Sequence, residues 1–123
     1  MWLYDTSVWV EWLLSSHLGK SFNAKFANIE TFLIPTLVQF ELQKWCLRER
    51  NDAEAERLLA LTMTGVVVPL DTATAIQAAL LAKRHNLHST DALIYATATL
   101  ANATLVTCDA HFHRLAGVQY FAK

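Results

Sequence analysis

Short apolar runs recur along the chain, and each is bounded by polar or turn-forming residues. A run of three or four apolar positions without polar alternation is typical of a strand buried on both faces of a sheet. The first run stops at Asp5, and Pro35 and Pro69 stop the second and third. The pattern predicts five strands, at residues 2–4, 32–34, 66–68, 104–106 and 118–121.

Longer segments between these runs carry apolar residues at helical spacing, and good capping residues precede them. Residues 5–7 precede the first helix, Thr36 precedes the helix after the second strand, and Asn51 precedes the next one. Residues 15–20 are predicted to form a turn, followed by a short helical piece that ends near Asn28. The pattern predicts longer helices at residues 8–14, 36–50, 52–62, 72–85 and 90–100.

Short apolar strands that alternate with helices predict an α/β fold, with a short parallel sheet and helices on both of its faces. The length of 123 residues, with few Gly and Pro, favours one domain over residues 1–123. In such sheets, ligands bind beyond the carboxyl ends of the strands. Side chains that directly follow strands are therefore the first candidates for a functional site.

Composition and charge add three points. Hydrophobic residues make up 54% of the chain, above the ~45–50% usual in soluble domains, which favours a surface covered by a second copy or another chain. The net charge of −1 means that any basic groove for a nucleic acid must be local. Cys46 and Cys108 have neither metal-ligand spacing nor the density of a disulfide scaffold.

The first residues form a strand-like segment rather than a charged leader with an apolar core, so no signal peptide is predicted. The apolar run from Ala92 to Cys108 is shorter than a ~20-residue membrane span and contains several Thr residues. We therefore expect a soluble, cytoplasmic protein without a membrane segment.

Four acidic residues occupy positions that direct them toward one edge of the predicted sheet. Asp5 follows the first strand and Asp109 follows the fourth. Asp91 lies in the first turn of a helix that is apolar nearly all round, and Glu41 lies at the edge of an apolar helical arc. A carboxylate beside an apolar core is costly unless it is paired or binds a metal.

Each acid also has a simpler interpretation when it is considered alone. Asp5 and Asp109 are common N-cap residues, and the helix dipole favours Asp91 where it lies. Glu41 and Lys44 have the spacing of an ion pair on a helix surface.

Considered together, the four carboxylates are typical of a site for Mg²⁺ or Mn²⁺, with Ser7 and Thr107 as neighbouring hydroxyls. A divalent cation relieves the repulsion between carboxylates that share a site. One ion with ordered waters, or two ions, can activate a water and stabilise an in-line displacement at phosphorus. The predicted catalytic and metal-binding residues are Asp5, Glu41, Asp91 and Asp109.

Four segments resemble, in order, the motifs of PIN-domain nucleases. The first is WLYDTSVWVEWLL at residues 2–14, and the second is PTLVQFEL at residues 35–42, with Glu41 in the acidic position. The third is STDA at residues 89–92, and the last is TCDAHF at residues 107–112. The resemblance covers essentially the whole chain, and its length is similar to that of VapC-type toxins, the nuclease half of toxin–antitoxin pairs.

The resemblance implies an endoribonuclease that depends on Mg²⁺ or Mn²⁺ and cleaves structured RNA such as tRNA or rRNA. It also implies a homodimer, and an antitoxin protein that wraps the toxin and occludes the acidic site. Carried over by position, Ser7 and Thr107 are supporting hydroxyls that orient an acid or a water. The metal-site carboxylates carried over are Asp5, Glu41, Asp91 and Asp109.

Several basic and aromatic residues are candidates for contacts with RNA. Basic side chains supply most nonspecific affinity for phosphates, although solvated helix faces explain them equally well. The basic candidates are Lys44, Arg48, Lys83 and Arg84. Tryptophans can stack on bases, but their helical spacing with other apolar residues favours the core or a dimer interface. These tryptophans are Trp9, Trp12 and Trp45.

Histidines flank two of the acidic positions. A zinc site is the alternative interpretation, but no cysteine has the spacing to complete one, so these histidines are expected to face solvent or nearby phosphates. They are His85, His88, His111 and His113. Asp71 is predicted to cap a helix rather than to bind a ligand.

Other functional classes fit the chain less well. Within the same fold, the alternative is a regulator that cleaves little and binds DNA through an antitoxin-like partner. A phospho-acceptor receiver domain needs an acidic pair near the first strand and a Lys after the last, whereas this chain has only Asp5 and the terminal Lys123. A DxD phosphatase is excluded because residue 7 is Ser, and a purely structural module would leave the four carboxylates without a purpose.

Overall fold

The computed structural model describes all 123 residues, and its centre is a set of five short parallel strands. Hydrogen bonds form a three-stranded group in the order β1-β4-β5 and a two-stranded group of β2 and β3. An isolated parallel bridge between Trp2 and Phe32 joins the groups, so the strands follow one another as β3-β2-β1-β4-β5. The strands are β1 (Trp2–Tyr4), β2 (Leu33–Pro35), β3 (Val66–Val68), β4 (Thr104–Thr107) and β5 (Val118–Tyr120).

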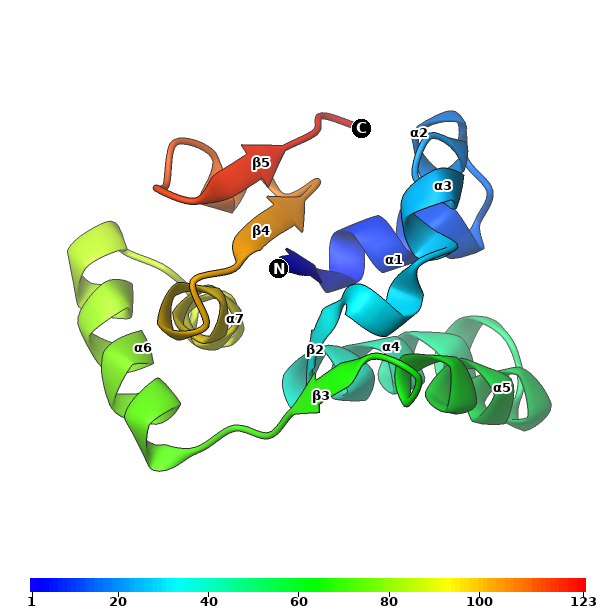
Figure 1. Cartoon of the computed structure of the whole chain (residues 1–123), viewed down its shortest axis with the longest axis horizontal. Coiled ribbons are helices and arrows are strands. Elements are labelled where there is room, and N and C mark those ends of the chain that lie inside the picture. The colour runs from blue at the N-terminus through cyan, green and yellow to red at the C-terminus, as the bar shows by residue number, and fades with distance from the viewer.

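Seven α-helices surround the strands, and two 3₁₀ turns, η1 (Ile29–Thr31) and η2 (Ala110–Phe112), complete the chain. In Figure 1, α6 and α7 lie to the left of the strands, whereas α1, α4 and α5 lie to the right. This arrangement confirms the predicted α/β fold with a short parallel sheet and helices on both faces. The helices are α1 (Thr6–Leu13), α2 (His17–Lys20), α3 (Asn23–Phe26), α4 (Thr36–Glu49), α5 (Asp52–Thr62), α6 (Thr72–His85) and α7 (Ser89–Leu100).

The predicted elements are present, with small differences at their ends and two local corrections. Thr36 was predicted to cap the helix after the second strand, but it is the first residue of α4, and Pro35 occupies the N-cap position without a side-chain hydrogen bond. Residues 15–20 were predicted to form only a turn, but α2 begins within them because the Ser16 hydroxyl accepts the Gly19 N–H at 2.9 Å. Gly19 is required there, since a Cβ atom at this position would lie 1.9 Å from the Glu11 carbonyl oxygen. Asp71 accepts the Thr74 N–H at 2.8 Å, which confirms the predicted cap of α6.

A continuous hydrophobic core fills the space between the strands and the helices. Trp9 is almost fully buried and packs edge-on against Phe26, so the prediction that it belongs to the core is confirmed. Trp12 stacks on Phe26, with its ring centroid 4.3 Å from that of Phe26. Cys46 and Cys108 are both buried and free.

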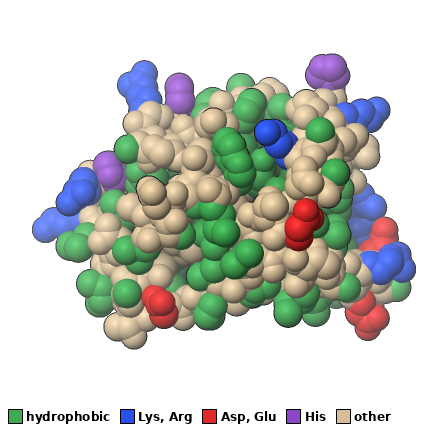
Figure 2. Space-filling view, in the orientation of Figure 1, with side chains coloured by type: hydrophobic (Ala, Val, Ile, Leu, Met, Phe, Trp, Pro, Cys, Tyr) green, Lys and Arg blue, Asp and Glu red, His purple; other side chains and the backbone are tan.

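The surface keeps many hydrophobic side chains exposed. Figure 2 shows them across the centre of one face, with most Lys and Arg side chains toward its margins. Exposed apolar side chains occur on α4, α5 and α6, and they include Phe40, Leu59 and Ile76. Among the helices, none combines the length and the apolar character that a membrane crossing requires.

The strand order defines the place where a ligand is expected. From β1 the chain proceeds to β2 and β3 on one side, and then returns past β1 to form β4 and β5 on the other. The order in which strands are added to the sheet therefore reverses between β1 and β4. Open α/β sheets bind ligands at such a switch point, beyond the carboxyl ends of the two strands. Asp5 follows β1 directly, and Asp109 follows β4 after one intervening residue.

Candidate metal and catalytic site

Asp5 is a buried carboxylate held at the end of β1. Its side chain accepts the Ser7 N–H at 3.0 Å and so caps α1, which confirms the capping interpretation. Capping is only part of its bonding, because the Ser7 hydroxyl donates to the same oxygen and the Thr107 hydroxyl donates to the other at 2.7 Å. Only 4% of Asp5 is exposed, so this carboxylate is fixed within the protein rather than solvated.

The same hydroxyls tie Asp5 to the strand beside it. Ser7 Oγ accepts the Cys108 N–H at 2.9 Å, and Thr107 Oγ1 accepts the Asp109 N–H at the same distance. The Asp5 N–H donates to the Val106 carbonyl at 3.0 Å, which continues the pairing of β1 with β4. The ends of the two strands are therefore joined by bonds to main chain and side chain.

Asp109 and Asp91 form the open side of the site. Asp109 accepts the His111 N–H at 2.9 Å and thereby caps η2, as the sequence indicated. Asp91 lies in the first turn of α7, where it was predicted. One oxygen from each of these carboxylates and one ring nitrogen of His111 lie within 4.8 Å of one another.

Glu41 approaches the site from α4. The Thr6 hydroxyl donates to its Oε1 at 2.7 Å, so the residue after Asp5 positions Glu41. The simpler interpretation, an ion pair between Glu41 and Lys44, is not observed, because no such pair lies within 4.0 Å. Helix α4 packs against both α1 and α7, which brings Glu41 into electrostatic contact with Asp91.

The electrostatics of the site favour a bound cation. Burial raises the pKa of Asp5 to about 6, although hydrogen bonds from Ser7 and Thr107 act in the opposite direction. Burial also raises the pKa of Glu41, and repulsion from Asp91 adds to this increase. For Asp91, burial and then the charge of Asp109 raise the pKa. Burial and mutual repulsion raise the free energy of the ionised carboxylates in this arrangement, and a bound divalent cation would remove that penalty.

The donor set also fits Mg²⁺ or Mn²⁺ chemically. These ions take carboxylate and water oxygens, and the structure offers oxygens from α4, α7 and the segments directly after β1 and β4. Every buried side-chain polar atom of the protein already has a hydrogen-bond partner, so the supporting hydroxyls are committed to orienting the acids. Ser7 and Thr107 both donate hydrogen bonds to the Asp5 carboxylate.

The basic candidates divide into two groups. Lys44 and Arg48 line a hollow of about 310 Å³ that begins at Thr6 and Glu41, together with Phe40. Lys83 and Arg84 lie in the last turn of α6, and no contact of theirs with the acidic side chains is observed. The structure thus places the first two beside the acids and leaves the second two apart from them.

Two residues of the site make contacts with the acids that the sequence did not predict. Thr6 was treated only as a capping residue, although its hydroxyl bonds Glu41. His111 was expected to face solvent or phosphate, and its side chain is 64% exposed, but its Nδ1 also lies 3.0 Å from Asp109 Oδ1. Its spacing of two residues from Asp109 was a usable signal, because a capped turn returns that side chain toward its cap.

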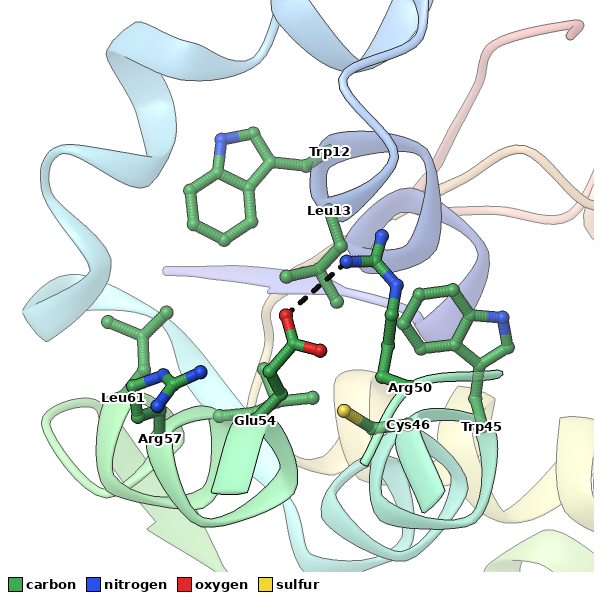
Figure 3. A pocket seen from close by; sticks show the side chains of 9 residues that line it. Trp12, Leu13, Trp45, Cys46, Arg50, Glu54, Arg57 and Leu61 are labelled. Carbon is green, nitrogen blue, oxygen red and sulfur yellow. Dashed lines mark hydrogen bonds and ion pairs between the residues drawn. The ribbon is translucent and has the colours of Figure 1, made fainter. Parts of the chain in front are cut away.

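A separate hollow lies between α1, α4 and α5, away from the acids (Figure 3). It measures about 200 Å³, and Arg50 and Glu54 form an ion pair of 3.5 Å at its rim. Trp45 lines it as well, with the Arg50 guanidinium 5.6 Å from the centroid of its ring. The remaining lining residues are Trp12, Leu13, Cys46, Arg57, Leu58 and Leu61.

The fold and the acidic edge define a PIN domain. The family model described as "PIN domain" matches residues 3–118, and the chain therefore belongs to this family, as the sequence motifs indicated. No curated protein matched the chain.

Solved structures share the fold over nearly the full length. A toxin–antitoxin complex from Klebsiella pneumoniae aligns with a TM-score of 0.84 at 21% identity, covering 100% of both chains. VapBC2 from Rickettsia felis, bound to a DNA fragment from its promoter, gives 0.76 at 18% identity, covering 98% of both chains. FitAcB from Neisseria gonorrhoeae gives 0.72 at 21% identity, covering 98% of this chain and 96% of the other. At these identities the similarity shows the fold.

Proposed function

We propose that this chain is a single-domain, cytoplasmic endoribonuclease that requires Mg²⁺ or Mn²⁺ and acts as the toxin of a toxin–antitoxin pair. The observation that supports this most directly is the convergence of acids at the carboxyl ends of β1 and β4. Asp5 is bonded to Thr107, Thr107 is bonded to Asp109, and Asp109 lies beside Asp91. Glu41 is the fourth acid, and the Thr6 hydroxyl donates a hydrogen bond to it. Structured RNA, such as tRNA or rRNA, is the proposed substrate.

The four carboxylates have different roles in this proposal. Asp5, whose two oxygens are held by hydroxyl groups, and Asp109 are rigid ligands for the ion. Asp91 shares the open side with Asp109. A bound divalent ion would supply a more acidic water and neutralise charge on the phosphate. Glu41 is suited to take a proton from the attacking water, because burial raises its pKa and Thr6 orients it.

The hollow beside Glu41 is the proposed path of the RNA. Phe40 is 60% exposed at its edge, and Lys44 and Arg48 follow at four-residue intervals along the same side of α4. An exposed aromatic ring can stack on an unpaired base while basic side chains contact phosphates. Lys83 and Arg84, in the last turn of α6, are proposed to contact more distant parts of a long substrate.

The hollow between α1, α4 and α5 is the proposed docking point of the antitoxin (Figure 3). The similar structures include toxin–antitoxin complexes, and a helix of a partner protein binds through apolar side chains placed in such grooves. Trp45 lines both this hollow and the one beside Glu41. A partner seated here would therefore lie next to the RNA path and could cover it.

The apolar surface also supports a homodimer. Ile76 and Leu80 lie one helical turn apart on α6 and are 62% and 56% exposed. Leu70, just before this helix, is exposed as well. Exposed apolar side chains that lie together are typical of surfaces covered by a partner. We propose that a second copy of the chain covers this face.

A regulatory function is the second candidate, and one observation favours it. Among the similar structures, VapBC2 from Rickettsia felis and VapBC from Salmonella typhimurium are bound to DNA. The net charge of this chain is −1, so contacts with DNA would have to come mainly from the partner. In that case the acidic site would contribute little to the function.

The test is RNA cleavage by the purified chain, free of any partner, with and without Mg²⁺ or Mn²⁺. Asp5→Asn should remove cleavage, whereas Glu56→Gln, an exposed acid on α5, should retain it. Metal-dependent cleavage that is lost only in the first variant would support the nuclease. No cleavage by a folded wild-type chain in either metal, with specific DNA binding once a partner is added, would favour the regulatory function.

A further inference from the structure

His111 lies against the acidic site and has no assigned role in the proposed chemistry. One of its ring nitrogens and one oxygen each from Asp91 and Asp109 lie within 4.8 Å of one another. These three donors come from two separate elements, α7 and η2. The cluster therefore depends on the tertiary fold and does not arise from neighbours along the chain alone.

The local structure holds His111 in this place. Asp109 Oδ1 accepts the main-chain N–H of His111 at 2.9 Å, and the ring Nδ1 lies 3.0 Å from the same oxygen. The next residue, Phe112, is only 1% exposed and anchors the turn in the core. On the other side, the ring of His88 lies 5.6 Å from that of His111 in an edge-to-face arrangement. The imidazole is thus restrained at the edge of the carboxylates.

The spacing of the donors suits one shared ion. Ligands at ~2.1 Å in octahedral geometry are about 3.0 Å apart when adjacent and about 4.2 Å apart when opposite. The separation of 3.0 Å between His111 Nδ1 and Asp109 Oδ1 equals the adjacent value. The three donor atoms all lie within 4.8 Å of one another, close to the range that one octahedral ion spans.

A simple ion pair gives a weaker account of the arrangement. The His111 side chain is 64% exposed, and a contact between exposed charged groups contributes little to stability. A pair between His111 and Asp109 alone would still leave Asp91 and Asp109 repelling each other, although His111 and His88 act against this repulsion. A cation that takes all three donors satisfies both carboxylates and the imidazole.

We propose that His111 is a ligand of the divalent cation, beside Asp91 and Asp109, and that its nitrogen makes the site prefer first-row transition ions to Mg²⁺. This inference rests on the proposed function, because it concerns the metal of the same site. Mg²⁺ binds oxygen donors and gains little from imidazole, whereas Mn²⁺ and later ions of the series accept nitrogen with increasing affinity. The site is therefore selective in a way that carboxylates alone would not be.

The experiment is Mn²⁺ binding by the full chain, followed by electron paramagnetic resonance. The intensity of the resonance signal from unbound Mn²⁺ gives the dissociation constant. Electron spin-echo modulation from ¹⁴N reports a nitrogen bound directly to the ion. Competition with Mg²⁺ gives the selectivity. The variants are His111→Gln, with His113→Gln and His88→Gln as matched controls, and Asp5→Asn to test the carboxylate site itself. Circular dichroism confirms that each variant is folded.

The expected result is nitrogen modulation in the wild type that disappears only in His111→Gln. Mn²⁺ affinity should fall by about tenfold or more in that variant, while Mg²⁺ affinity changes by less than about threefold. The two control histidine variants should resemble the wild type. The Mn²⁺ dissociation constant should also rise in Asp5→Asn, because the carboxylate site is then incomplete.

Three outcomes would overturn the inference. Mn²⁺ binding that depends on Asp5 but shows no nitrogen modulation would remove His111 from the site and leave the proposed nuclease intact. If the nitrogen modulation disappears in His88→Gln and not in His111→Gln, the metal ligand is His88 rather than His111. No Mn²⁺ binding by the wild type, or binding unaffected by Asp5→Asn, would reject the carboxylate site and with it the proposed function.

Discussion

The Thr107 hydroxyl donates a hydrogen bond of 2.7 Å to Asp5 Oδ2, joining two side chains that are 102 positions apart in the sequence. The same hydroxyl oxygen accepts the Asp109 N–H, so a single buried side chain orients one acid and the main chain of another. Thr107 itself is fully buried. It is therefore a positioning residue that links the end of β1 to the end of β4.

Replacing Thr107 with valine keeps the shape of this side chain and removes the hydroxyl. We expect a loss of about 1–3 kcal/mol in the free energy of unfolding, because the Asp109 N–H loses its acceptor and Asp5 loses a donor. Urea denaturation measures this loss. The control is Thr104→Val on the same strand, where the hydroxyl makes no side-chain hydrogen bond and the stability should change little.

The charge of Asp5 makes the stability of the metal-free protein depend on pH. Its pKa is about 6 in the folded chain and 3.8 for an ordinary Asp, so the folded state binds more protons between these values. Stability must then fall as pH rises through this interval and stay lower above it. A difference of about two pH units corresponds to about 3 kcal/mol. Asp5→Asn should lack this decrease.

The measurement is chemical denaturation of both proteins in chelator at pH 4, 5, 6 and 7. Relative to the wild type, Asp5→Asn should become progressively more stable as pH increases. This difference in stability between the two proteins would not depend on pH if another group already neutralised the charge of the buried Asp5 carboxylate. Equal pH profiles for the two proteins would therefore contradict the assigned environment of Asp5.

Addition of a divalent cation should reverse this instability. At about 100 times its dissociation constant, a bound ligand adds about 2.7 kcal/mol, which raises the melting temperature of a domain of this size by roughly 10 °C. Differential scanning fluorimetry with Mn²⁺, and then with excess chelator, measures the shift. Asp91→Asn should lose most of it, and Glu56→Gln should retain it.

RNA binding should depend on the basic side of α4. Arg48→Ala removes one proposed phosphate contact in the hollow beside Glu41, so affinity should fall and the slope of log K against log salt should decrease by about 0.7. Fluorescence anisotropy with a single-stranded RNA, in Ca²⁺ to prevent cleavage, measures both quantities. Lys20→Ala on α2 makes the same change in charge and should leave the slope unchanged.

In the same assay, stacking of an RNA base on Phe40 should contribute to affinity but not to its dependence on salt. Phe40→Ala should weaken binding by about 1–3 kcal/mol without altering the salt slope, because the lost contact carries no charge. Phe40 is exposed, so the fold should persist. An unchanged affinity would move the RNA path away from this hollow.

Local patterns in the sequence determined much of the fold. Three apolar residues followed by Asp5 gave a strand and a helix cap, and Asp71 gave a second cap, because capping needs only neighbouring residues. Alternation of such strands with helices also predicted parallel pairing, since antiparallel hairpins need much shorter connections. The helical turn at α2 was missed because it depends on the close approach of Gly19 to the main chain of α1.

What only the tertiary structure decided is how the acids reach one another. Nothing local in the sequence states that β1 lies beside β4, and this adjacency puts the hydroxyl of Thr107 on Asp5. The bond from Thr6 to Glu41 and the position of His111 near Asp91 likewise join segments from different elements. Residue types and periodicity determine which side chains end a strand or face a core. Contacts between distant segments follow from strand order and helix packing, which only the folded chain defines.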